Sequence, residues 1–303
     1  MKSIVFIILI FLLMQVIGLY IGNIYIGLIR TGDLPQPEAI PGVSSNSPEV
    51  PFLLFGYIIL VTAIMLFVIK VRKSAVRGIE AFVVFVSSWV TFSFLIPFPV
   101  QDFWINSLYS LFNPLGLGFI AGIITLDLIF ALTLTTWKVL KPTIISQNIA
   151  AIFSGSGVGA LLGLSLGVVP CIIFMMILSV YDFVSVFITK HMVTMAKAVT
   201  ERPMAFTIAA PHKFSKAKFV PTKGKQKVHV FQLGLGDIII PMMFSVAALN
   251  KFGIVSSIFI IAGSLLSLVA LTLIITRKPM ALPALPFVCS GALAGYILSL
   301  LFL

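Results

Sequence analysis

Charged side chains are scarce in this sequence. Asp, Glu, Lys and Arg make up 10% of its 303 residues, while apolar residues make up 60%. A water-soluble domain needs far more polar surface, so this composition excludes one and predicts a protein that lies in a lipid bilayer. A membrane-spanning helix needs about 20 mostly apolar residues, so the chain has room for about nine such helices and little else.

Cysteine and histidine are also rare, which argues against disulfide frameworks, zinc sites and serine-protease sites. The two cysteines, Cys171 and Cys289, lie inside apolar segments, make no disulfide framework or zinc cluster, and are predicted to be packing residues. The sequence has no HExxH motif for a zinc protease. The stretch Ser154–Gly157 faintly resembles a serine nucleophile motif, but all three histidines that could act as its base fall at or beyond the inner membrane boundary. We therefore expect no metal and no cofactor.

Acidic residues number 9 against 20 basic ones, which gives a net charge of +11. Nucleic-acid binding is not expected, because the basic residues lie in short loops between apolar segments, where they orient the chain. With the N-terminus in the cytoplasm, the outer loops hold only Arg30 and Lys251, and inner residues include Lys138. The apolar segments are 3–28, 51–70, 80–98, 115–137, 144–167, 168–190, 230–250, 254–276 and 281–303. The sequence predicts an all-α protein of the cell membrane with nine transmembrane helices, a cytoplasmic N-terminus, an external C-terminus and lipid around it.

One polytopic domain, residues 1–303, is expected. Within it, residues 1–167 form five scaffold helices, and residues 168–303 form four helices around a cytoplasmic loop, 191–229. The stretches Met204–Ala210 and Val228–Leu233 have some β character. On the fifth segment, glycines spaced by four predict one face for close helix packing: Gly155, Gly159, Gly163 and Gly167.

Three acids fall inside apolar segments: Asp127, Asp182 and Asp237. An ionisable group in hydrocarbon is costly, so each is a functional candidate. Asp182 lies about 12 Å and Asp237 about 15 Å from the inner boundary at 1.5 Å per residue, on segments that run in opposite directions. Since consecutive helices are usually neighbours, we expect these two carboxyl groups to face each other. Asp127 is expected to have a structural or cavity-lining role.

Two facing carboxyl groups have a specific chemistry. They share one proton, because both cannot easily be ionised at once. The ionised group can activate a water, and the neutral group can protonate the oxygen of a peptide carbonyl. Beside Asp237, the glycines of Gly234-Leu235-Gly236 allow a substrate backbone to approach. The prolines of Leu282–Pro286 disfavour regular helix at a similar depth.

These residues resemble the presenilin and signal peptide peptidase family of intramembrane aspartyl proteases. The resemblance rests on Tyr181-Asp182, Gly234-Leu235-Gly236-Asp237 and Pro283-Ala284-Leu285, in matching order and segments. It is strongest over 175–290 and closest to the archaeal homologues, whereas the first five segments match in number and hydropathy alone.

The resemblance implies that Asp182 and Asp237 are the catalytic acids and that Pro283-Ala284-Leu285 shapes the site and engages the substrate. It implies that Tyr181, Gly234, Leu235 and Gly236 support them. The substrates would be membrane-spanning helices of proteins or signal peptides that unwind before cleavage, and residues 228–233 could pair with them as an added strand. We predict no accessory subunits. The alternative is a proton-coupled transporter that uses its buried acids, although no repeated pair of broken segments supports it.

Overall fold

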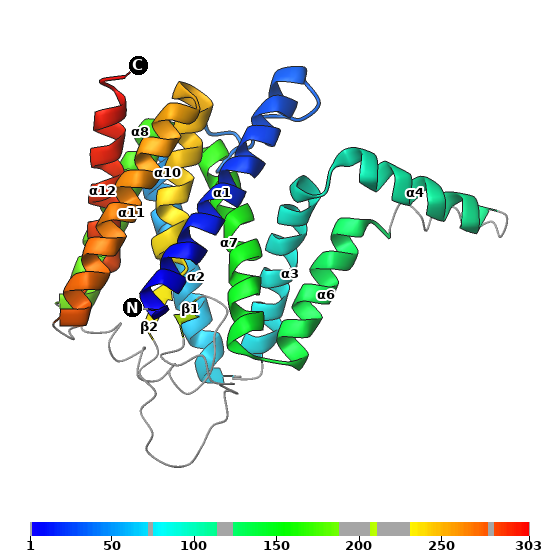
Figure 1. The fold of residues 1–303 in the computed structure, drawn as a ribbon, viewed down its shortest axis with the longest axis horizontal. Coiled ribbons are helices and arrows are strands. Elements are labelled where there is room, and N and C mark those ends of the chain that lie inside the picture. The colour runs from blue at the N-terminus through cyan, green and yellow to red at the C-terminus, as the bar shows by residue number, and fades with distance from the viewer. Residues whose placement is uncertain are drawn as a thin grey trace, which may run out of the picture.

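The computed structural model describes residues 2–71, 75–113, 124–187, 207–210, 231–277 and 282–302. Almost all of them are helical (Figure 1). The elements, in chain order, are α1 (Lys2–Thr31), α2 (Val50–Val71), α3 (Ala75–Leu95), α4 (Phe98–Phe112), α6 (Leu126–Leu140), α7 (Ile144–Ser165), α8 (Val168–Phe187), β1 (Thr207–Ala210), β2 (Phe231–Gly234), α10 (Gly236–Phe252), α11 (Ile254–Arg277) and α12 (Ala284–Ser299).

Helices lie in all of the predicted apolar segments, and among the described residues five are long and apolar enough to cross a membrane. These five lie within α1, α3, α7, α8 and α11. The strands lie at the end of the bundle where α1 begins, and α12 finishes at the opposite end (Figure 1). The predicted fourth segment, 115–137, is observed as α6 from Leu126 onward, and residues 114–123 lie outside the described part.

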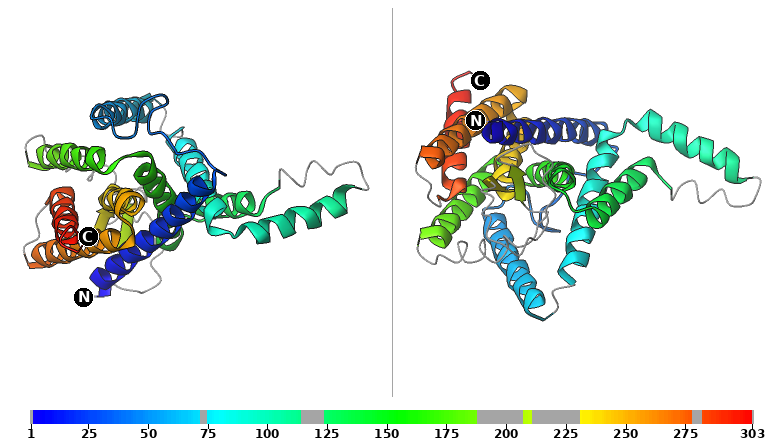
Figure 2. Two further views of the ribbon diagram at one scale, coloured as in Figure 1. Left: turned by 90° about the horizontal axis from the view of Figure 1, so that it is seen from above. Right: turned by 60° about the horizontal axis from the view of Figure 1, so that its bottom comes forward.

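Helix α4 was not predicted as a helix. It projects sideways from the bundle in both views of Figure 2, beyond the break at Pro97 that ends the run of α3. Its polar residues interrupt the apolar run that a spanning helix requires. Asp102, Asn106 and Ser110 recur every four residues, however, so they form one polar stripe on a helix. The side chains of Phe103 and Tyr109 are exposed.

Helix α10 is the buried centre of the bundle and packs against α1, α7, α8 and α11. Small residues on α7 allow both α1 and α10 to pack closely against it. A Cβ atom added to Gly155 would lie 2.6 Å from Met14 Cε of α1, and one added to Gly163 would lie 2.5 Å from the Met243 carbonyl of α10. Gly159 is in equally close contact with Met242. The predicted glycine face is thus confirmed within α7, while Gly167 lies beyond the helix.

Polar contacts join α3 and α6. The Asp127 carboxylate accepts hydrogen bonds from Trp89 Nε1 at 2.9 Å and Ser93 Oγ at 2.6 Å. Lys138 Nζ lies 2.6 Å from Glu80 Oε1, and both side chains are largely buried. The sequence treated Lys138 as a loop charge that orients the chain. Instead it lies in the last turn of α6, because its partner on α3 offsets the cost of burying it.

Strands β1 and β2 form an antiparallel pair in which Thr207 faces Gly234 and Ala210 faces Phe231. They confirm the β character of the two predicted stretches where these are described. Val228–Val230 and Met204–Phe206 lie outside the described residues. At the buried start of α7, Gln147 Nε2 donates to the Thr207 carbonyl at 2.7 Å, which fastens β1 to the bundle.

Candidate active site

Asp182 lies on α8, in its last two turns, and its side chain is only 6% exposed. Its Oδ2 atom accepts a hydrogen bond of 3.2 Å from the backbone N–H of Leu285, in the first turn of α12. The first N–H groups of a helix have no partner within it and carry partial positive charge. The carboxyl group of Asp182 therefore satisfies the N-terminus of α12 and is held there.

Asp237 lies in the first turn of α10, directly after β2, and is partly buried. The backbone of Gly234 hydrogen-bonds its carboxyl group. A Cβ atom added to Gly234 would lie 3.1 Å from Asp237 Oδ2, closer than ordinary van der Waals contact. A side chain at position 234 would therefore require the Asp237 carboxyl group to shift by a few tenths of an ångström.

The two carboxyl groups come together as the sequence predicted. Helices α8 and α10 pack against each other, which brings Asp182 close enough to Asp237 for the two carboxyl groups to influence each other electrostatically. Both acids lie at helix positions fixed by backbone N–H donors from other segments, Leu285 for one and Gly234 for the other. Such a pair can hold one proton between its two members and polarise a water.

The Pro283-Ala284-Leu285 segment lies at this pair. Pro283 is buried and caps α12 in extended conformation, with φ −65° and ψ 122°. Pro286 falls within the first helical turn, where the missing N–H costs nothing. The prolines therefore begin α12 at a defined residue, and this places the Leu285 N–H on Asp182.

Leu235 and Gly236, which precede Asp237, differ in their surroundings. The Leu235 side chain is buried against Gly155 of α7, so it anchors the backbone between β2 and α10. Gly236 is exposed, and a Cβ atom added there would meet nothing within 4 Å. Open space thus adjoins the backbone immediately before Asp237.

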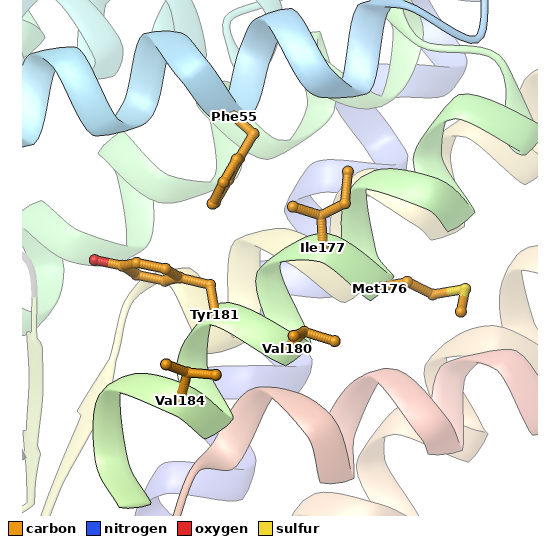
Figure 3. Close-up of a pocket in the computed structure, with 6 residues that line it drawn as sticks. All are labelled: Phe55, Met176, Ile177, Val180, Tyr181 and Val184. Atoms are coloured by element: carbon orange, nitrogen blue, oxygen red, sulfur yellow. The ribbon is translucent and has the colours of Figure 1, made fainter. Parts of the chain in front are cut away.

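Tyr181 does not join the acids. Its ring meets Phe55 of α2 edge-on, with centroids 5.7 Å apart, while Asp182 faces α12. Tyr181 and Phe55 line an apolar groove of about 410 Å³ between α2 and α8 (Figure 3). Its remaining lining residues are Met176, Ile177, Val180 and Val184. The resemblance implied a supporting role for Tyr181; its side chain points away from that of Asp182 because adjacent residues on a helix point about 100° apart.

The two cysteines are both buried in one apolar core cluster, which confirms the prediction that they are packing residues. Cys289 lies on α12 four residues after Leu285, so the two residues share one face of that helix. The sequence did not indicate that this cysteine lies near the two acids.

Comparison with known proteins identifies a family whose sequence model matches this chain. A sequence model described as signal-peptide peptidase, presenilin aspartyl protease matches residues 38–303. No curated protein matches the sequence.

Two solved structures of a presenilin family intramembrane aspartate protease share the fold. The one in space group C222 has a TM-score of 0.61 and 19% identity, and the match covers 96% of this chain and 94% of that one. The one in space group P2 has a TM-score of 0.62 and 21% identity, with 98% and 96% covered.

Proposed function

The chain belongs to the signal-peptide peptidase and presenilin family of aspartyl proteases, and we propose that Asp182 and Asp237 are its catalytic pair. The protein is a multi-pass membrane protein and an intramembrane aspartyl protease. The family match therefore argues against the alternative reading, a proton-coupled transporter. The observation that carries the residue assignment is the placement of both acids where α8, α10 and α12 pack together, with Asp182 held by the backbone N–H of Leu285.

The pair acts on a peptide bond as one unit that holds a single proton. The ionised carboxyl group takes a proton from a water, which attacks the peptide carbon. The neutral carboxyl group gives its proton to the carbonyl oxygen. Collapse of the tetrahedral intermediate returns that proton to the pair and transfers the other to the leaving nitrogen. The hydrogen bonds from the backbone of Leu285 to Asp182 and of Gly234 to Asp237 stabilise negative charge on either carboxyl group during both steps.

Replacing either acid tests the assignment. Asp182→Asn and Asp237→Asn should each lower kcat at least about 1,000-fold, because general acid and base catalysis are both lost. Asp127→Asn is the matched control, since Asp127 is also 6% exposed but binds Trp89 and Ser93 away from the pair. Cleavage of a transmembrane peptide by purified protein is measured by mass spectrometry, with the melting temperature as the folding check. Normal activity in either of the first two variants would reject the assignment.

The proposed topology is nine spans in the cell membrane with the N-terminus inside. The concentration of Lys and Arg in loops on one side supports it. So does the placement of the strands at the end where α1 begins, because the sequence between them, residues 211–230, contains six lysines. We see no need for accessory subunits.

The proposed substrates are transmembrane helices or signal peptides that unwind at the site. Strand β2 leads straight into Gly236 and Asp237, so a segment paired with β2 would pass the acids in extended form. We propose that a substrate helix arriving through the lipid first contacts the apolar groove lined by Phe55 and Tyr181.

Strand pairing requires N–H groups on the substrate. Methylating one backbone nitrogen next to the cut bond should raise KM at least about 5-fold, since one hydrogen bond to a buried strand contributes about 1 kcal/mol. The same methyl group ten residues away in the helical part is the control. Equal KM values for the two peptides would reject strand addition while leaving the catalytic pair untouched.

A further inference from the structure

Helix α1 carries one buried polar side chain in the middle of an apolar run. Gln15 is 0% exposed, next to Met14, which is also fully buried. A buried amide that makes no hydrogen bonds is strongly unfavourable, so its partners in the fold matter. Gln15 shares a helix face with Gly18 and Gly22, since the spacing is three and seven residues. That face packs on α10, and α1 precedes the region that the family model matches.

The amide of Gln15 binds the turn that carries Asp237. Its Nε2 atom donates to the carbonyl oxygen of Ile238 at 3.3 Å, across 223 residues of sequence. Its Oε1 atom lies 3.5 Å from the hydroxyl of Ser245, farther along the same helix. The side chain therefore spans from the first turn of α10 to its middle.

Pro241 explains why this turn needs an outside support. It lies inside α10 and has no backbone N–H, so the carbonyl of Asp237, four residues earlier, loses its partner within the helix. The first turn is thus joined to the rest of α10 by fewer hydrogen bonds than a regular turn. Gln15 reaches both sides of the proline from α1, at Ile238 and at Ser245, and so adds a connection across the part of α10 where one helical hydrogen bond is missing.

We propose that Gln15 is a positioning residue, which holds the first turn of α10 so that the carboxyl group of Asp237 meets Asp182. Gln15 touches neither the acids nor the substrate and acts through Ile238. This inference rests on the proposed catalytic role of Asp237. Because catalytic groups need placement to within about 0.5 Å, a released first turn lowers the turnover of bound substrate rather than its binding.

Three variants separate positioning from packing. Gln15→Leu keeps the size but removes the donor. Gln15→Glu keeps the shape and, as a neutral carboxyl group in a buried apolar site, keeps one donor. Ser156→Ala is the matched control, because its buried hydroxyl donates to the Met14 carbonyl of α1 at 3.4 Å and leaves α10 alone. The measurements are kcat and KM on a transmembrane peptide, and the melting temperature.

Gln15→Leu should lower kcat about 10- to 100-fold with KM within about twofold, the size expected when a catalytic group moves by up to 1 Å. Gln15→Glu should restore kcat to within about threefold of the unmodified protein, because the donor returns. Ser156→Ala should keep its kcat. A normal kcat in Gln15→Leu, or a kcat in Gln15→Glu as low as in Gln15→Leu, would overturn the proposal.

Two further outcomes are decisive. If Gln15→Leu does not fold, Gln15→Met replaces it with the same expectation, and failure of both to fold would assign Gln15 to the fold alone and overturn the positioning role. Asp237→Asn is assayed in parallel. An active Asp237→Asn would reject the catalytic assignment itself, whereas an inactive Asp237→Asn beside a fully active Gln15→Leu would reject only the role of Gln15.

Discussion

Adding one methyl group at Gly234 should slow catalysis by a predictable amount. The new Cβ atom would lie 3.1 Å from Asp237 Oδ2, and ordinary contact begins at 3.4 Å, so the carboxyl group must retreat by about 0.3 Å. If a displacement of 1 Å costs about 100-fold in rate, 0.3 Å costs about 4-fold on a logarithmic scale. We therefore expect Gly234→Ala to lower kcat about 4-fold with little change in KM.

Gly236→Ala is the matched change on the other side of Leu235. Within the part of the chain that the structure describes, no atom lies within 4 Å of the added Cβ, so we expect the free protein to accept it without displacement of the acid or loss of kcat. The methyl group would instead occupy the open space where a substrate backbone passes, which raises KM. Both variants should keep the free energy of unfolding within about 1 kcal/mol, because neither glycine has a positive φ.

The assay compares kcat and KM of the two variants on one transmembrane peptide in lipid bicelles, with the melting temperature as control. The reasoning predicts opposite signatures, a kcat effect at Gly234 and a KM effect at Gly236. A normal kcat for Gly234→Ala would show that Asp237 has room to spare. A loss of kcat at Gly236 with KM unchanged would show that the space beside it does not receive the substrate.

Two further predictions concern the α3–α6 contacts. Asp127→Ala should lower the free energy of unfolding by about 1–3 kcal/mol, because the part-buried donors of Trp89 and Ser93 lose their acceptor, whereas Asp127→Asn keeps an acceptor and should lose less than half as much; thermal unfolding measures both. Lys138→Met should destabilise by about 3 kcal/mol because Glu80 loses its cation, and Lys138→Met with Glu80→Leu together should recover most of that loss in a double-mutant cycle.

Each of these has a contradicting outcome. Equal stability of Asp127→Ala and Asp127→Asn would mean that the carboxylate is not needed as an acceptor. Additive losses in the double variant of Lys138 and Glu80 would mean that the pair does not act as a unit.

The proximity of the two acids could be predicted from the sequence because few residue types tolerate hydrocarbon. Asp182 and Asp237 stand out in apolar runs, and the rise per residue alone places them at a similar depth. The burial of Leu235 and the contact of Leu285 with Asp182 could not be predicted in the same way. They depend on how the first turns of α10 and α12 face their neighbours, which is set by packing between distant segments.

Other features escaped because their signals were ambiguous. Lys138 has the composition of a loop charge, and only its partner 58 residues earlier makes it a buried residue. Helix α4 has too many polar residues to match the pattern of a membrane-spanning segment, so a search for long apolar segments does not identify it. Gln15 was visible as a lone amide in an apolar run, but its partner lies 223 residues away, beyond the reach of any local pattern.

The hydrogen bond from Leu285 to Asp182 also constrains when the enzyme can become active. The two residues are 103 positions apart, and the donor lies at the start of α12. Because synthesis runs from the N-terminus, the Asp182 carboxyl group can gain this partner only after the chain has been made as far as α12. A chain truncated before α12 would therefore carry both acids but lack the hydrogen bond that holds Asp182.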